Sequence, residues 1–181
     1  MRLGIYIGSF NPPHEGHQRV IQYVLEKTLV DQVLLLPTPN YWNKNNLVDI
    51  KEREEMLKVY EDERVLVDTI HNKYPYTYEV LRSLKKDYPK DELYIIMGSD
   101  NLEKLHEWKE IKEILQNKVI VLRRGKIMKN PHLKEYEKQF LYEEDFEYLD
   151  ISSTEIRKGN SKYLDPVIKQ YIEEHHLYEE D

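Results

Sequence analysis

The stretch Gly8-Ser9-Phe10-Asn11-Pro12-Pro13-His14-Glu15-Gly16-His17 marks a change from strand to helix that decides the fold. The preceding residues, 3–7, form a short apolar run with β-branched side chains, which is typical of a buried strand. Gly8 allows the backbone to turn, and the two prolines delay a regular helix until about Pro13. Helical spacing of apolar residues follows, at Val20, Ile21, Val24 and Leu25.

Two histidines stand at the start of this predicted helix. His14 and His17 are three residues apart, so they share one face of the first turn. The backbone N–H groups of a first turn lack partners and carry partial positive charge, which favours anions. The pair therefore indicates phosphate chemistry rather than metal binding. The alternative is that both residues only cap the helix.

Strands and helices alternate along the rest of the chain. This alternation predicts an α/β, Rossmann-like, doubly wound parallel sheet with helices on both faces. We expect one domain over residues 1–181, with a helical C-terminal part at about 153–178. Ligands of such sheets bind at the carboxyl ends of the strands. The predicted strands are 3–7, 32–36, 64–67, 93–97, 119–122 and 146–151, and the predicted helices include 14–27, 50–60, 77–86, a segment with Trp108 and Ile111, and 130–141.

Composition excludes several classes of protein. The 181 residues contain no cysteine, which excludes disulfides and cysteine zinc sites and fits a reducing cytoplasm. The net charge of −7 argues against broad nucleic-acid binding. The N-terminus shows no signal-peptide pattern, and no apolar run approaches the ~20 residues of a membrane span. Exposed aromatic residues leave homo-oligomerisation open.

A second group of functional residues follows residue 150. The run Ile151-Ser152-Ser153-Thr154-Glu155-Ile156-Arg157 predicts a helix that begins at hydroxyl side chains. Its free N–H groups and the cation one turn later suit a bound phosphate. Alone, the run is also what a plain helix cap with an exposed arginine looks like.

Taken together, these motifs resemble the nucleotidyltransferase superfamily that carries a His-x-Gly-His motif. Within it, the chain is similar to the nicotinate/nicotinamide mononucleotide adenylyltransferases. Three further segments match that family: Gly98-Ser99-Asp100 followed by Trp108, Tyr76-Thr77, and Arg123-Arg124-Gly125. The tail from Tyr163 to Tyr178 also resembles the family's ending. The resemblance covers nearly the whole chain.

The resemblance implies an enzyme of NAD biosynthesis that transfers the adenylyl group of ATP, with Mg²⁺, to nicotinate or nicotinamide mononucleotide and releases pyrophosphate. It implies catalytic roles for His14, His17 and Arg157. The implied ATP-binding residues are Gly8, Ser9, Phe10, Gly98, Asp100, Ser153 and Thr154. The implied mononucleotide-binding residues are Lys44, Tyr76, Thr77, Trp108 and Arg124. It implies no dedicated metal site on the protein.

Some alternatives stay open at this stage. Many bacterial nicotinate enzymes carry a Pro-Pro-His-Lys-like segment where this chain has Asn40-Tyr41-Trp42-Asn43-Lys44-Asn45-Asn46, so the choice between acid and amide on the ring is undecided. A cytidylyltransferase or phosphopantetheine adenylyltransferase would keep the histidine motif. Trp108 read alone suggests a core residue. The remaining histidines are predicted at the surface: His71, His106, His132, His175 and His176.

Overall fold

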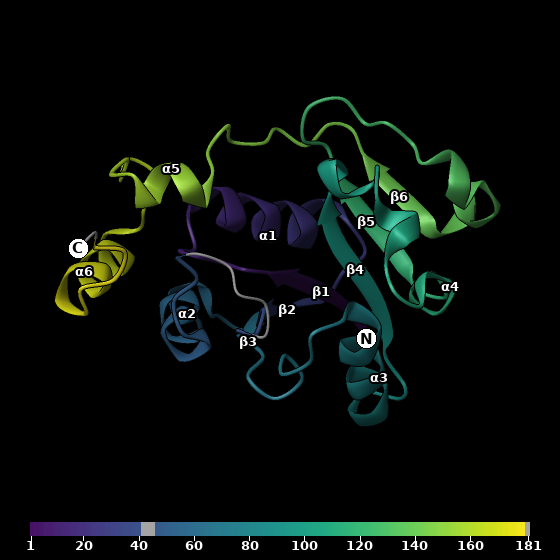
Figure 1. Ribbon diagram of the computed structural model, residues 1–181. Coiled ribbons are helices and arrows are strands. Elements are labelled where there is room, and N and C mark those ends of the chain that lie inside the picture. The colour runs from purple at the N-terminus through teal and green to yellow at the C-terminus, as the bar shows by residue number, and fades with distance from the viewer. Residues whose placement is uncertain (41–45, 180–181) are drawn as a thin grey trace.

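A six-stranded parallel sheet forms the centre of the computed structural model, which describes residues 1–40 and 46–179 (Figure 1). Its strand order is β3-β2-β1-β4-β5-β6. This is the doubly wound order: successive strands are added toward one edge from β1 to β3 and toward the other edge from β4 to β6, so the strand order reverses between β1 and β4. The strands are β1 Arg2–Gly8, β2 Gln32–Pro37, β3 Val65–Val67, β4 Glu92–Gly98, β5 Lys118–Leu122 and β6 Phe140–Glu143.

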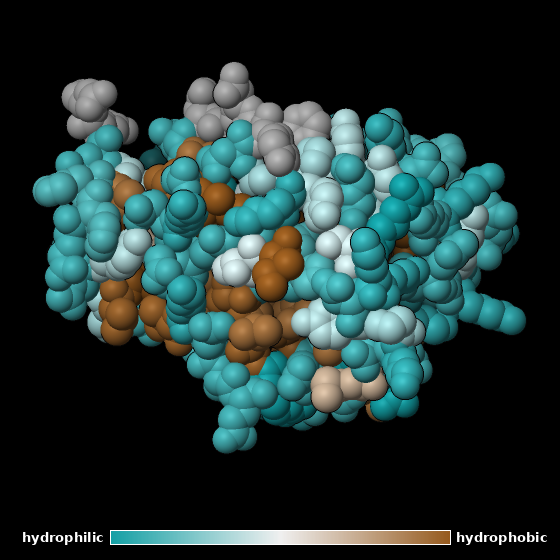
Figure 2. Space-filling view, turned by 90° about the horizontal axis from the view of Figure 1, so that it is seen from below, coloured by the Kyte–Doolittle hydropathy of each residue, from teal (hydrophilic) through white to brown (hydrophobic). Residues whose placement is uncertain are grey.

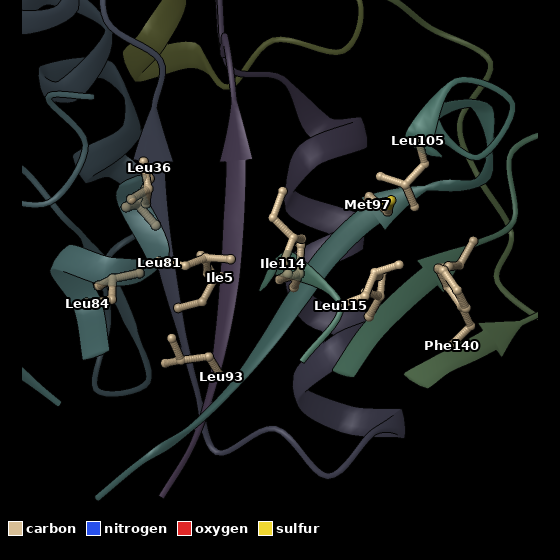
Figure 3. Close-up of a cluster of buried hydrophobic side chains, with 14 of the residues drawn as sticks. Ile5, Leu36, Leu81, Leu84, Leu93, Met97, Leu105, Ile114, Leu115 and Phe140 are labelled. Atoms are coloured by element: carbon tan, nitrogen blue, oxygen red, sulfur yellow. The ribbon is translucent and has the colours of Figure 1, made fainter. Parts of the chain in front are cut away.

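Helices cover both faces of the sheet and bury two separate apolar clusters. One cluster joins the sheet to α3 and α4, and Figure 3 shows its side chains, such as Ile5, Leu81 and Ile114, gathered on one side of the strands. The other cluster joins the opposite face to α1, α2 and α6. The helices are α1 Glu15–Lys27, α2 Ile50–Leu57, α3 Thr77–Asp87, α4 Ile111–Ile114, α5 Ser153–Arg157 and α6 Pro166–Glu174.

The fold class predicted from the sequence is confirmed. Neighbouring residues in β4 show why its continuous apolar run predicted a buried strand. Ile95 packs in the first cluster and Ile96 in the second, as expected for a strand buried on both faces. The extent of the domain, residues 1–181, stays a prediction.

The predictions were wrong between residues 130 and 151. The sixth strand is Phe140–Glu143 rather than 146–151, because this bulky run pairs with the edge of β5, with Val119 opposite Phe140. The expected helix at 130–141 is instead a kinked 3₁₀ segment, Pro131–Gln139. Phe146 is still buried, but by packing in the second cluster. Short apolar runs do not distinguish such outcomes by periodicity.

The segment around Trp108 also departs from the expected helix. Trp108 follows a short 3₁₀ turn, Leu105–Glu107, in extended conformation, and α4 begins three residues later. A second 3₁₀ turn, Lys58–Tyr60, forms the last part of the expected helix 50–60. A third, Ser99–Asn101, follows the end of β4.

His71 is buried, which contradicts its predicted surface position. Its side chain is 5% exposed and lies between two carboxylates, with Nδ1 2.7 Å from Asp68 Oδ2 and Nε2 2.6 Å from Asp87 Oδ2. Burial alone would lower the pKa of His71, but the hydrogen bonds to Asp87 and Asp68 outweigh it and raise that pKa. The imidazole thus ties the segment after β3 to the end of α3.

This cluster predicts a pH-dependent contribution to stability. Since the folded pKa of His71 is raised, its contribution is complete below the unfolded pKa of about 6.5 and is lost as pH rises through the folded pKa. The variant His71→Gln should therefore lose more thermal stability relative to wild type at about pH 6 than at about pH 9. Melting curves of both proteins at the two pH values measure this, and an equal loss at both would contradict it.

The face of the molecule in Figure 2 is mainly hydrophilic, with hydrophobic residues gathered in a few patches. Among the large apolar side chains left exposed are Leu66 and Ile70, on and after the edge strand β3. Within residues 1–40 and 46–179, no helix is both long enough and apolar enough to span a membrane.

Candidate active site

A cavity of about 380 Å³ opens at the carboxyl ends of β1, β4 and β5. It lies where the strand order reverses, between β1 and β4, which is the usual ligand position in this fold. Ten residues predicted for the site line this cavity: Gly8, Ser9, Phe10, His14, His17, Thr77, Gly98, Asp100, Trp108 and Arg124.

The turn between β1 and α1 holds the two histidines in a fixed arrangement. His14 is the N-cap of α1, and its Nδ1 accepts a hydrogen bond of 3.0 Å from the N–H of Gly16. In return, the N–H of His14 donates to Nδ1 of His17 at 3.0 Å. The two rings lie with their centroids 3.8 Å apart and their planes tilted by 32°. The residues therefore do cap the helix, and they line the cavity as well.

These hydrogen bonds fix the tautomer of both rings. Because each Nδ1 accepts a hydrogen bond from a backbone N–H, a neutral imidazole must carry its own proton on Nε2. Burial lowers the pKa of His14 to about 4, and Arg124 adds to that shift. The pKa of His17 is also lowered, mainly by burial and then by the nearby His14 and Arg124. The free site thus holds two neutral N–H donors at neutral pH.

Close packing around the pair depends on aromatic contacts and on glycine. Phe10, which has a φ of 47° and is buried, sets its ring edge-on to His17 at 4.8 Å between centroids. A Cβ at Gly16 would lie 2.7 Å from Cε1 of His14. A Cβ at Gly98 would lie 2.5 Å from a carboxylate oxygen of Asp100. Both glycines therefore make room for a functional side chain.

The turns after β4 and β5 are joined to each other across the cavity. The N–H of Arg124 donates to the hydroxyl of Ser99 at 2.7 Å, and that hydroxyl donates to the Arg124 carbonyl at 3.0 Å. The Arg124 guanidinium donates to the carbonyl of Ile151 at 3.2 Å. A cation is thereby held at the mouth of a site in a chain of net negative charge.

Helix α5 lies against the turn between β1 and α1. The hydroxyl of Ser153 donates to the Pro12 carbonyl at 2.9 Å. Arg157 donates to the Asn11 carbonyl at 2.7 Å and to the hydroxyl of Thr154 at 3.2 Å. These three predicted residues thus stand beside the turn rather than among the residues that line the cavity.

The residues predicted for the mononucleotide are spread over the cavity and its edge. Thr77 and Trp108 line the cavity, and Trp108 also packs against the first apolar cluster. Tyr76 lines a smaller pocket that shares Thr77 and Ile7 with the main one. The ammonium group of Lys109 lies 4.6 Å from the centre of the Tyr76 ring. Lys44 lies outside the described residues.

Sequence reasoning missed the buried cation behind the site. Arg53 of α2 is fully buried, and it donates to the carbonyls of Ser9 and Val48, both at 2.9 Å. It also reaches the side-chain oxygen of Asn40 at 3.1 Å. Burial lowers the pKa of Arg53. An arginine in a polar helical pattern reads as a surface residue, so nothing in the sequence alone marked it.

Comparison with known proteins identifies the family. Residues 5–159 match the cytidylyltransferase-like family model. The chain is 34% identical to a probable nicotinate-nucleotide adenylyltransferase of Acholeplasma laidlawii, with 97% of both chains covered. It is 32% identical to the nicotinate-nucleotide adenylyltransferase of Bacillus subtilis, with 98% of each covered.

A solved structure shares the fold at lower identity. The Plasmodium falciparum nicotinic acid mononucleotide adenylyltransferase in complex with NaAD superposes with a TM-score of 0.80 and 21% identity, over 98% of this chain and 97% of that one. The strand order, the paired imidazoles and the matches along the full length lead to one assignment. This chain belongs to the cytidylyltransferase-like nucleotidyltransferases and, within them, to the nicotinate-nucleotide adenylyltransferase family.

Proposed function

We propose that this protein transfers the adenylyl group of ATP to nicotinate mononucleotide. An oxygen of the acceptor's 5′-phosphate attacks the α-phosphorus of ATP, the bond from that phosphorus to the bridging oxygen breaks, and pyrophosphate leaves. The observation that carries the proposal is the pair of pinned imidazoles at the carboxyl edge of the sheet. The names of the full-length relatives support nicotinate as the ring of the acceptor.

In this proposal, His14 and His17 act on the phosphates of ATP. Because both imidazoles are neutral Nε2–H donors, they can lie beside the Arg124 guanidinium and beside each other without charge repulsion. Phosphate oxygens would then raise the pKa of each imidazole and draw positive charge toward the reacting phosphorus. Stabilising charge that develops in the transition state is the main task in such transfers, since no covalent intermediate with the protein is needed.

The rest of the ATP site would be assembled from backbone groups and α5. The triphosphate would lie between the His14 turn and α5, with Arg157 as the cation on that side. Asp100 would accept hydrogen bonds from the ribose hydroxyls. The remaining proposed ATP-binding residues are Gly8, Ser9, Phe10, Gly98, Ser153 and Thr154.

Mg²⁺ would enter as the MgATP substrate. The described residues contain no cluster of three acidic or histidine side chains that could hold a metal ion. Mg²⁺ commonly keeps several waters and binds through substrate phosphates, so such a cluster is not required.

The mononucleotide would occupy the side of the cavity near α3. Trp108 would stack on the pyridine ring, Thr77 and Tyr76 would lie beside it, and Arg124 would meet its phosphate. Lys44 completes the proposed set from the sequence alone. We also propose that the protein is cytoplasmic. We propose that its partners are small molecules rather than nucleic acid or a membrane. Homo-oligomerisation is a matter for measurement.

Product formation tests the proposal directly. The protein is incubated with ATP, Mg²⁺ and either nicotinate or nicotinamide mononucleotide, and dinucleotide and pyrophosphate are followed together. We expect dinucleotide from nicotinate mononucleotide with the higher kcat/KM. The double variant His14→Ala/His17→Ala, purified identically, controls for host enzymes. Binding of ATP without dinucleotide from either acceptor would overturn the proposal and favour another acceptor within the superfamily, such as phosphopantetheine.

The variant Trp108→Ala should raise the KM for the mononucleotide by about tenfold and leave the KM for ATP nearly unchanged. The reason is that stacking on a nucleotide ring contributes roughly 1–3 kcal/mol for each ring removed. Trp108→Phe, which keeps an aromatic face, should recover most of the affinity. Steady-state kinetics with each substrate varied in turn measure both constants. Equal changes for both substrates would mean that Trp108 serves only the core.

A further inference from the structure

The last described residues fold back against the turn that carries the two imidazoles. Leu177 packs against the second apolar cluster, and its N–H donates to the Ile172 carbonyl at 3.0 Å. On either side of it, His176 has a φ of 52° and Tyr178 a φ of 60°. Residues other than glycine adopt this left-handed conformation when surrounding contacts hold them there. The contacts of Tyr178 therefore call for an explanation.

The hydroxyl of Tyr178 reaches the site turn directly. It donates to Oδ1 of Asn11 at 2.5 Å, across 167 residues of sequence. Asn11 is 4% exposed, and the same oxygen accepts from the N–H of Val48 at 3.3 Å. Its Nδ2 donates to the Asn46 carbonyl at 2.7 Å. The Asn11 amide is thus held on both sides, and Tyr178 supplies its shortest contact.

The main chain of Asn11 is also the point where the proposed catalytic cation is attached. The carbonyl of Asn11 accepts from Nη1 of Arg157 at 2.7 Å. Two residues earlier, the Ser9 carbonyl accepts from the buried Arg53. His14 follows three residues after Asn11, with two prolines between. A shift of Asn11 would therefore move Arg157 and the start of the His14 turn together.

The phenol keeps its proton in this setting. Burial raises the pKa of Tyr178, although the neighbouring guanidinium groups of Arg53 and Arg157 act in the opposite direction. The hydroxyl therefore remains a donor at neutral pH, as the acceptor oxygen of Asn11 requires.

We propose that Tyr178 is a positioning residue for adenylyl transfer: its hydroxyl fixes Asn11, and Asn11 sets the placement of Arg157 and of the His14 turn. The inference rests on the proposed function, because the groups being placed are those assigned to the phosphates of ATP. It gives the segment after α6 a part in placing the turn between β1 and α1.

The test compares two tyrosine hydroxyls of the C-terminal region. Tyr178→Phe removes only the hydroxyl on Asn11. Tyr171→Phe is the matched control, since its hydroxyl donates to Glu52 Oε2 at 2.6 Å, away from the site. We expect Tyr178→Phe to lower kcat by about tenfold, because small misplacements of catalytic groups are costly. The control should keep the wild-type kcat, and both should melt near the wild-type temperature.

A double-mutant cycle separates positioning from general stability. If Tyr178 acts through Asn11 on Arg157, the kcat losses of Tyr178→Phe and Arg157→Lys should combine to less than their product. Independent losses that multiply, or an equal loss in both tyrosine variants, would overturn the inference. Wild-type turnover, measured alongside, tests the proposed function by itself. Binding of ATP to all variants by calorimetry shows whether the site is still formed.

Discussion

Replacing His17 by alanine is expected to lower kcat by about 10²–10³-fold while the protein stays folded. The variant removes one of two Nε2–H donors that line the cavity, and it also frees the N–H of His14 from its partner Nδ1. Loss of one preorganised donor aimed at charge that develops in the transition state typically has an effect of this size. The loss should appear mainly in kcat, because the donor matters most in the transition state.

The measurement uses initial rates at saturating MgATP and nicotinate mononucleotide, with thermal melting as the check on folding. His132→Ala is the control, because His132 is exposed and lies outside the cavity lining. Losing the capping contact should cost only about 1 kcal/mol of stability. A well-folded His17→Ala protein that retained the wild-type kcat would refute the role assigned to this residue.

The sheet could be predicted because its information is local. Each of the first five strands is a short apolar run. In four of them the residues alternate between two buried clusters, as Ile95 and Ile96 do, whereas the edge strand β3 buries one face and exposes Leu66. The sixth strand was misplaced because two apolar runs, at 140–143 and 146–151, competed for one edge of β5. The pairing of Phe140 with Val119 decides between them, and the sequence of either run alone does not predict that pairing.

The site was predictable to the extent that its residues follow strand ends. His14, Gly98 and Arg124 come from three separate strand ends, and the structure brings all three to one cavity. Contacts that depend on loop paths could not be foreseen. The buried His71 needs Asp87 from another element, and Arg53 needs the carbonyl of Ser9. Such polar groups become recognisable only when their partners are placed, because each looks like an ordinary surface residue in sequence.

The variant Gly16→Ala is expected to lower kcat by about a hundredfold without lowering the melting temperature. Its new Cβ would lie 2.7 Å from Cε1 and 2.9 Å from Nδ1 of His14, so the imidazole must move. Movement would break the hydrogen bond from the Gly16 N–H and the close ring contact with His17. An error of about 1 Å in the position of a catalytic group can cost 10²-fold in rate.

Stability should change little, because the gain in helix propensity offsets the loss of the capping contact made by the displaced imidazole. Gly16 lies in the first turn of α1 at a φ that alanine tolerates, and alanine favours a helix by up to about 1 kcal/mol over glycine. Gly159→Ala makes the contrast: its φ is 111°, and a Cβ there would meet no heavy atom of the described residues within 4 Å. That variant should lose stability by about 1–2 kcal/mol and keep its kcat. Kinetics and melting of the two alanine variants therefore distinguish two roles of glycine: Gly16 leaves room for the His14 imidazole, whereas Gly159 serves only the backbone conformation. A Gly16→Ala enzyme with full activity would show that the imidazole can relax without cost and that its pinned orientation is not required for the reaction.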